Sequence, residues 1–264
     1  KIINSIMKVA KKDDLVIIRS TVKVGTTDKI ENILNKKNVN VCFCPERTIE
    51  GDAINELKKL PQIIGANTNK SYLAAKSFFS FFGVKVLKKI SAKEAELAKL
   101  MCNSERDLYF AIANEVALFC EKLKMNVYNV LEASTTDYGR SHLKLPGPVG
   151  GPCLEKDPYI LINSCKSFNF NIIGKSRVVN ESLIKSSVRR ISTTLAYRDI
   201  NPKKIAILGC AFKGSPPTAD VRGSLFYPLL KLIKNKYKNE NIVAHDFFSE
   251  EVNAQDHAIS SIND

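Results

Sequence analysis

The chain has 264 residues, of which 44% are hydrophobic and 25% are charged. These proportions are ordinary for a globular protein, and the length is sufficient for two domains. No apolar run approaches the roughly 18 residues that a membrane helix needs, and the first residues lack the layout of a signal peptide. The composition therefore predicts a cytoplasmic protein with no membrane association.

A formal net charge of +13 would suit a polyanionic partner such as a nucleic acid. However, the lysines are spread along the chain, and neither a helix-turn-helix pattern, a zinc-finger pattern nor an aromatic platform is found. We therefore expect a solvated basic surface and no nucleic-acid partner. An anionic small substrate is also compatible with this charge.

The cysteines are seven in number and irregularly spaced, which favours reduced thiols over disulfides. Cys42 and Cys44 are separated by one residue, which is not the spacing of a zinc knuckle. We interpret them as neighbours on opposite faces of a strand. No metal site is expected.

Short apolar segments alternate with helical patterns along residues 1–90, which is typical of a parallel α/β sheet. The expected strands are 15–18, 39–44 and 84–87. The expected helices are 1–11, a second one after Gly25, and 70–82. This part of the chain is predicted to be the C-terminal part of a Rossmann-like domain.

Longer helices are expected from about residue 91 onward. Residues 92–124 contain neither proline nor glycine and carry apolar positions at helical spacing, which indicates one connecting or dimer-forming helix. A glycine- and proline-rich loop at 134–153 follows, and 155–197 returns to helix.

A second α/β unit begins near the end of the sequence. Its expected elements are a strand at 204–208, a helix at 224–235 and a strand at 242–245. The predicted domains are 1–90, 91–200 and 201–264, the last a partial Rossmann-like unit. Two strands are too few for a stable sheet, so we expect the chain to be truncated at both ends.

Residues 150–157 read Gly-Gly-Pro-Cys-Leu-Glu-Lys-Asp and carry the clearest chemical signal. The glycines before Cys153 allow close backbone approach to a ligand, because they have no Cβ. Lys156 adds a cation that can lower the pKa of a nearby thiol, and a thiolate is a strong nucleophile. The alternative interpretation is a glycine-rich loop with a buried, inert cysteine.

Glu96, Lys99 and Asn103 are spaced so that they share one face of the expected long helix. Arg106 is interpreted as extending this stripe. A stripe of polar residues is also typical of a solvated surface. The loop 45–51, Pro-Glu-Arg-Thr-Ile-Glu-Gly, follows a strand, where ligands of open α/β sheets bind, but it is equally a charged connecting loop.

Together these segments resemble the UDP-glucose/GDP-mannose 6-dehydrogenase family of nucleotide sugar dehydrogenases. The ordered motifs are Ser20-Thr21-Val22 with Gly25-Thr26-Thr27, Pro45-Glu46-Arg47 with Glu50-Gly51, Glu96-x-x-Lys99-x-x-x-Asn103, Asn114-Glu115, Gly150-Gly151-x-Cys153-x-x-Lys156-Asp157, and Gly209-x-Ala211-Phe212-Lys213 with Asp220-x-Arg222-x-Ser224. Pro-Glu-Arg, Asn103-x-x-Arg106-Asp107 and Pro146-Gly147-Pro148-Val149 look like the branch that oxidises UDP-N-acetylmannosamine or UDP-N-acetylglucosamine.

The resemblance implies a four-electron oxidation at sugar C6 with NAD, through a cysteine thiohemiacetal and thioester. The implied catalytic residues are Cys153, Lys99, Asn103, Asp157, Glu50 and Thr21. The implied cofactor-binding residues are Thr21, Lys156 and Arg222. The implied substrate-binding residues are Arg47, Thr48, Lys99, Asn103, Arg106, Arg140, Gly150, Phe212 and Lys213. A homodimer through the long helix is also implied.

Three departures from the family pattern accompany the resemblance. Tyr138 and Pro152 stand where this branch often has other residues, which leaves the sugar preference open. The sequence contains no Gly-x-Gly-x-x-Gly segment, so we expect this chain alone to bind NAD poorly and to be inactive. A non-catalytic relative that retains only nucleotide-sugar binding is the alternative.

Overall fold

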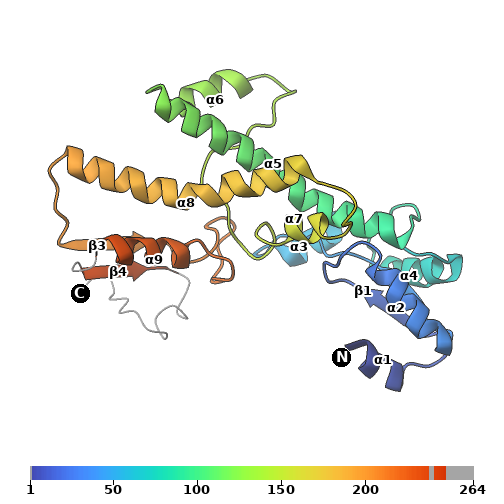
Figure 1. The fold of residues 1–264 in the computed structure, drawn as a ribbon. Coiled ribbons are helices and arrows are strands. Elements are labelled where there is room, and N and C mark those ends of the chain that lie inside the picture. The colour runs from blue at the N-terminus through green and yellow to red at the C-terminus, as the bar shows by residue number, and fades with distance from the viewer. Residues whose placement is uncertain (1, 238–240, 248–264) are drawn as a thin grey trace. The chain divides into compact units, whose positions relative to one another are not determined.

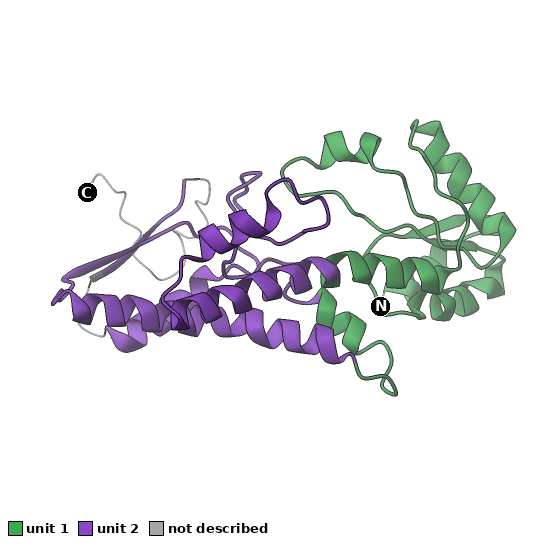
Figure 2. Cartoon of the chain, turned by 90° about the horizontal axis from the view of Figure 1, so that it is seen from above, with its two compact units in different colours: residues 1–104, 157–169 green, residues 105–156, 170–264 purple. Residues whose placement is uncertain are grey.

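The computed structural model describes residues 2–237 and 241–247 (Figure 1). It divides into two compact units, the first made of residues 1–104 and 157–169 and the second of 105–156 and 170–264 (Figure 2). The sequence-based division into three domains, 1–90, 91–200 and 201–264, stays a prediction.

The first unit is built on two parallel strands, β1 (Leu15–Ile18) and β2 (Asn40–Phe43). Their register pairs Leu15 with Asn40 and Ile18 with Phe43. All four β2 residues are buried, as expected for a strand covered on both faces. The helices of this unit are α1 (Ile2–Val9), α2 (Thr26–Leu34), the 3₁₀ turn η1 (Asn35–Lys37), α3 (Ala53–Lys59), α4 (Asn69–Phe81), the start of α5 (Ala92–Lys122), and α7 (Asp157–Ile162).

The expected strand at 84–87 is wrong, since this segment forms only an isolated bridge between Gln62 and Val86. Gln62 donates to the Lys85 carbonyl at 2.7 Å and accepts from the Leu87 N–H at 3.0 Å. Pro61 comes just before Gln62 and has no N–H, so it cannot donate to a longer ladder. Helix α3 was also missed, because no element was assigned between the 45–51 loop and Ile63.

Cys42 of β2 and Cys44, the first residue after it, point to the same side, so the expectation of opposite faces is wrong. Side chains two residues apart on a strand point to the same side. The two sulfurs are 3.6 Å apart and both side chains are fully buried. The hydrogen bond that Cys44 donates to Cys42, together with burial, raises the pKa of the Cys44 thiol well above its usual range. The Cys44 thiol therefore stays protonated, and both cysteines are part of the core.

The second unit combines two long helices with a second parallel strand pair. Its elements are the remainder of α5, α6 (Val127–Thr135), α8 (Asn171–Tyr197), β3 (Lys204–Leu208), α9 (Phe226–Lys236) and β4 (Asn241–His245). Strand β3 pairs with β4 in parallel, Lys204 opposite Asn241 and Leu208 opposite His245. The core of this strand pair is formed by Val188, Ile207, Cys210, Phe226, Leu230, Ile233 and Ala244.

The α/β class, with parallel strands and a long central helix, is confirmed. The expected helix over 155–197 is instead two helices, α7 and α8, because the polar run 163–167 carries no apolar periodicity. Helix α5 ends close to Lys124, whose φ of 56° is incompatible with continuing a right-handed helix. Among the helices described, none is long and apolar enough to cross a membrane.

Candidate active site

The loop after β1 is held by a buried carboxylate of α5. Glu96 is fully buried, and its Oε2 accepts the Gly25 N–H at 2.5 Å. Its Oε1 accepts the N–H of Thr27 at 2.7 Å and the Thr27 hydroxyl at 2.6 Å. A carboxylate is favourable at the first turn of a helix, where backbone N–H groups have no partner within the helix. Glu96 therefore fixes the start of α2 and the loop that contains Thr21.

The polar stripe of α5 is buried rather than solvated. Glu96, Lys99 and Asn103 are each less than a tenth exposed, whereas Leu97 and Met101 on other faces are 40% and 41% exposed. Burial of a lysine and an asparagine is costly unless their polar atoms find partners. The solvated-surface interpretation of these three residues is therefore wrong.

Arg106 does not extend this buried stripe, because its side chain is exposed. The buried polar position one helical turn after Asn103 is Asp107. The expectation that Arg106 extends the stripe is therefore wrong, while a role of Arg106 in substrate binding stays a prediction.

Asp157, the first residue of α7, meets the stripe at Asn103. The Asn103 amide donates to Asp157 Oδ2 at 2.6 Å, and both side chains are buried. At this short distance the bond has the character of a charge-assisted hydrogen bond. Three of the predicted catalytic residues, Lys99, Asn103 and Asp157, thus lie within the first unit.

The Pro45–Gly51 loop is organised by Glu46, to which no role was assigned from the sequence. Glu46 Oε1 accepts the backbone N–H groups of Arg47 and Thr48, each at 2.9 Å, and its other oxygen forms an ion pair with Arg19. Burial raises the pKa of Glu46, but the hydrogen bonds from Thr48 and Arg19 outweigh it and hold this pKa below its usual value.

The functional candidates of the same loop differ in exposure and in their partners. Arg47 donates from its guanidinium to the Pro61 carbonyl, which ties the loop to the segment after α3. Glu50 is exposed, whereas Thr48 is half-buried. The loop thus offers one exposed carboxylate beside a guanidinium that has a backbone partner.

The cysteine loop is built by close backbone contacts within the second unit. Gly151 has a φ of 95° and donates its N–H to the Gly223 carbonyl at 2.7 Å. A Cβ on Gly151 would lie 2.6 Å from a ring carbon of Phe212, so only glycine fits. Cys153 follows this contact and is exposed, which contradicts the alternative of a buried cysteine.

Phe212 is therefore next to the loop that presents Cys153. The Lys213 Nζ lies 5.6 Å from the centre of the Phe212 ring, a cation–π distance. The Phe212 N–H donates to the Asp220 carbonyl at 3.0 Å, and Arg222 donates from Nε to the Asp220 carboxylate at 2.9 Å. These contacts join the loop that carries Cys153 to the segment that carries Phe212, Lys213 and Arg222.

The predicted site residues are divided between the two units. The first unit holds Thr21, Arg47, Thr48, Glu50, Lys99, Asn103 and Asp157; the second holds Arg106, Arg140, Gly150, Cys153, Lys156, Phe212, Lys213 and Arg222. Arg140 lies 4.9 Å over the ring of Tyr138 and is otherwise exposed. In the described residues, no cluster of three potential metal ligands occurs.

Two parallel strand pairs, with polar loops at the carboxyl ends of β1 and β2, define an α/β protein. Loops at this edge are where open α/β sheets bind ligands. Residues 1–82 match the model of the UDP-glucose/GDP-mannose dehydrogenase family NAD binding domain, and residues 93–182 match the model of the central domain of the same family. The chain belongs to the UDP-glucose/GDP-mannose dehydrogenase family.

Its relatives include enzymes named for UDP-N-acetyl-D-mannosamine. The UDP-N-acetyl-D-mannosamine dehydrogenase of Methanocaldococcus jannaschii is 36% identical over 217 residues, which cover 81% of this chain and 49% of the relative. The solved structure of the UDP-D-ManNAc dehydrogenase of Pyrococcus horikoshii is 32% identical with a TM-score of 0.85, and the match covers 94% of this chain and 60% of that one.

A third relative carries a different substrate name. The NDP-N-acetyl-D-galactosaminuronic acid dehydrogenase of Methanosarcina mazei is 27% identical with a TM-score of 0.83, over 98% of this chain and 58% of that one. The chain spans about half to three fifths of the length of these relatives.

Proposed function

We propose that the full-length protein oxidises the C6 hydroxyl of a UDP-N-acetylhexosamine, UDP-N-acetylmannosamine in the first place, to the carboxylate with NAD. Membership of the family and the names of its relatives support the reaction class. The observation that carries the proposal is the exposed Cys153 thiol, presented by a glycine loop that packs on Phe212.

In this proposal Cys153 divides the oxidation into two parts. The alcohol loses a hydride and a proton to give the aldehyde, and the thiol adds to the aldehyde as a thiohemiacetal. Loss of a second hydride and proton leaves a thioester, which water hydrolyses to release the carboxylate and the thiol. Covalent capture prevents loss of the aldehyde between the two oxidations.

The buried residues of the first unit supply electrostatics and positioning. Lys99 stabilises the developing oxyanion, and a cation does this most effectively in a site that excludes water. The hydrogen-bonded pair Asn103 and Asp157 orients the lysine and the attacking water. Glu50 acts as the acid–base carboxylate, supported by Thr21.

Two NAD molecules, bound in turn, would each accept one hydride. Thr21 is suited to contact NAD, because it is half-buried in the loop at the carboxyl end of β1, where open α/β sheets bind ligands. The N-terminus of α2 is not available to bind the NAD diphosphate, because Glu96 accepts the N–H groups of Gly25 and Thr27. Lys156 and Arg222 complete the proposed cofactor contacts.

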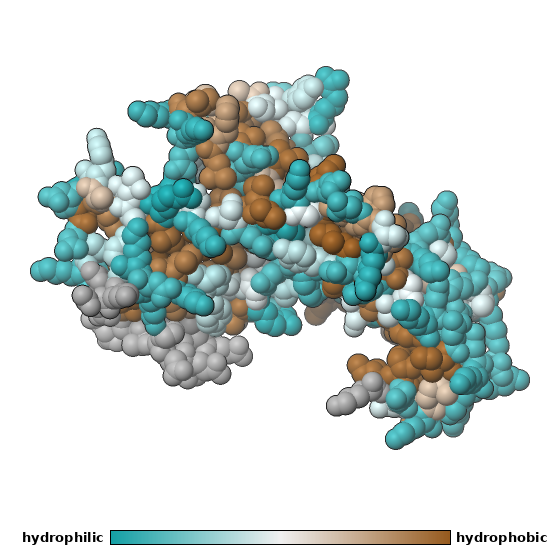
Figure 3. Space-filling view, viewed as in Figure 1, coloured by the Kyte–Doolittle hydropathy of each residue, from teal (hydrophilic) through white to brown (hydrophobic). Residues whose placement is uncertain are grey.

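We also propose a homodimer formed through α5. Several large apolar side chains on and after the C-terminal half of α5 are exposed, namely Phe119, Leu123, Met125 and Tyr128. Figure 3 shows apolar residues gathered over the region of α5 and α6. Such a patch is typical of a protein–protein interface. Size-exclusion chromatography with light scattering should give twice the protomer mass.

The decisive experiment removes the thiol in the full-length protein. Cys153→Ala should abolish acid formation and leave nucleotide-sugar binding intact, while Cys153→Ser should stall after capture, because an ester hydrolyses less readily than a thioester. Cys165→Ala, at another exposed thiol, serves as the control. Full acid production by Cys153→Ala would remove this residue from the reaction. Absence of any oxidation by the parent protein would favour the binding-only relative.

A second experiment addresses Lys99. Lys99→Ala should lower turnover on the order of 10²–10³-fold, as removal of an oxyanion donor does, and should change substrate affinity less. Lys76→Ala, at an exposed position of α4, is the matched control. Equal turnover in Lys99→Ala and the parent would contradict the assigned role.

A further inference from the structure

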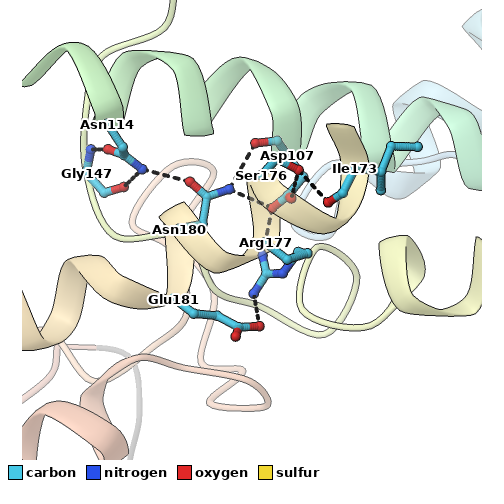
Figure 4. Close-up of polar contacts among 8 residues, drawn as sticks. All are labelled: Asp107, Asn114, Gly147, Ile173, Ser176, Arg177, Asn180 and Glu181. Atoms are coloured by element: carbon cyan, nitrogen blue, oxygen red, sulfur yellow. Dashed lines mark hydrogen bonds and ion pairs between the residues drawn. The ribbon is translucent and has the colours of Figure 1, made fainter. Parts of the chain in front are cut away.

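Asn114 of α5 binds both backbone polar groups of Gly147 (Figure 4). Its Oδ1 accepts the Gly147 N–H at 2.7 Å, and its Nδ2 donates to the Gly147 carbonyl at 3.0 Å. The asparagine is fully buried, although its motif Asn114-Glu115 received no role in the reaction. This two-point contact fixes Gly147 on both sides, because its N–H and its C=O belong to the two peptide units that flank its Cα.

A chain of buried groups backs this contact from α8. Asn114 Nδ2 also donates to Asn180 Oδ1 at 2.9 Å. Asn180 in turn donates to the carbonyl and to Oδ1 of Asp107, each at 2.9 Å. The donors and acceptors of both amides therefore have one consistent orientation. These hydrogen bonds connect α5, α8 and the loop before Cys153 within the second unit.

This hydrogen-bond network ends at a buried ion pair between Asp107 and Arg177. Arg177 Nη1 donates to Asp107 Oδ1 at 2.6 Å, and the two side chains are 2% and 0% exposed. Burial lowers the pKa of Arg177, but the charge of Asp107 and the hydrogen bonds to Asp107 and Glu181 outweigh it and raise this pKa. Breaking such a pair is costly, so the network keeps a single arrangement.

Among residues 146–148, only Gly147 can be held by hydrogen bonds to both its N–H and its C=O. The flanking residues, Pro146 and Pro148, have no N–H and a fixed φ, so the Gly147 peptide alone offers a donor in this stretch. The loop is held again at Gly151, whose N–H is bonded at 2.7 Å to the Gly223 carbonyl. Only three residues separate Gly147 from Gly151, and only Pro152 separates Gly151 from Cys153.

We propose that Asn114 is a positioning residue for the Cys153 thiol. It fixes the loop that carries Cys153 by hydrogen-bonding the N–H and the C=O of Gly147, a contact that we call the clamp. Asn180 and Asp107 hold the Asn114 amide in its orientation. The clamp itself is independent of the reaction. Its consequence for turnover rests on the proposed function of Cys153.

Hydrogen exchange measured by mass spectrometry tests the clamp without reference to activity. In the full-length protein, Asn114→Ala should speed exchange in peptides covering 147–153 about tenfold, because the Gly147 N–H loses its acceptor. Asn180→Ala should give a smaller increase, since it removes only the backing. Ser176→Ala is the matched control: it removes a 3.2 Å bond to Asp107 but leaves Gly147 untouched.

Steady-state kinetics then separate positioning from stability. Asn114→Ala should lower kcat about 10²-fold with KM nearly unchanged, because a thiol misplaced by about 1 Å reacts poorly. Ser176→Ala should retain kcat. Unchanged exchange in Asn114→Ala, or equal acceleration in Ser176→Ala, would overturn the proposal. If Cys153→Ala proved fully active, the proposed function would fail while the exchange result still decided the clamp.

Discussion

Asn103 and Asp157 are 54 positions apart in sequence and joined by a 2.6 Å hydrogen bond in a buried environment. The asparagine comes from the middle of α5 and the aspartate from the first turn of α7. The bond ties the segment just after Cys153 in sequence to the helix that carries Lys99. The pair links two of the motifs on which the family resemblance depends.

Removing this bond should destabilise the first unit. Asn103→Ala takes a donor from a buried carboxylate and should lower the free energy of unfolding by about 1–3 kcal/mol. Urea denaturation followed by circular dichroism measures the effect. Asn32→Ala, at an exposed position of α2, should leave the midpoint within error. Equal midpoints for both variants would show that the bond contributes nothing to stability.

Two glycines of the second unit should respond differently to alanine. Gly151→Ala forces a left-handed φ of 95° on alanine and places a Cβ 2.6 Å from Phe212, which should cost about 1–3 kcal/mol. Gly139→Ala places its Cβ in open space and should be nearly neutral. Thermal melts of both variants test this. A Gly151→Ala protein as stable as Gly139→Ala would mean that the loop readily shifts away from Phe212.

The regular elements were predictable where local pattern decides structure. The strand at Leu15–Ile18 and the length of α5 follow from apolar runs and from the absence of glycine and proline. The segment 84–87 was misassigned because its pairing partner is limited by Pro61, a residue remote in sequence. Helix α3 was missed because its charged composition resembles that of a loop.

The candidate site was predictable only as far as motifs extend. The order of the motifs was sufficient to predict Cys153, Lys99 and Asp157 as site residues. It could not predict which groups Glu96 binds, because its partner Thr27 is 69 positions away in sequence. The burial of the α5 stripe was likewise not evident, since polar spacing is the same on a solvated face and on a buried one. Tertiary contacts decide both matters.

The stability of the Pro45–Gly51 loop should depend on pH through Glu46. Its pKa is lowered in the folded protein, so its contribution is present above the unfolded value of 4.5 and is lost as the pH falls through the folded value. The difference in unfolding midpoint between the parent protein and Glu46→Gln should therefore be largest near pH 7 and decrease as the pH falls below 4.5. A difference that grows on acidification would have the wrong sign and would contradict this assignment.

The substrate preference is the sharpest prediction for the full-length protein. Arg106 is exposed on α5, and a guanidinium suits carbonyl or phosphate oxygens of a nucleotide sugar. An enzyme that hydrogen-bonds an acetamido group should disfavour the analogue without it by on the order of 10²-fold or more in kcat/KM, because its polar partners would be left unpaired.

NADH production should therefore be compared for UDP-N-acetylmannosamine, UDP-N-acetylglucosamine, UDP-N-acetylgalactosamine, UDP-glucose and GDP-mannose. We expect UDP-N-acetylmannosamine to be preferred, and Arg106→Gln to narrow the gap to UDP-glucose if this residue contacts the acetamido oxygen. If Arg106 contacts the diphosphate instead, the variant should weaken all UDP-sugars alike. A clear preference of the parent for UDP-glucose or GDP-mannose would refute the acetamido assignment and leave the Cys153 chemistry intact, because the thiol acts at C6 and not at the substituent of C2.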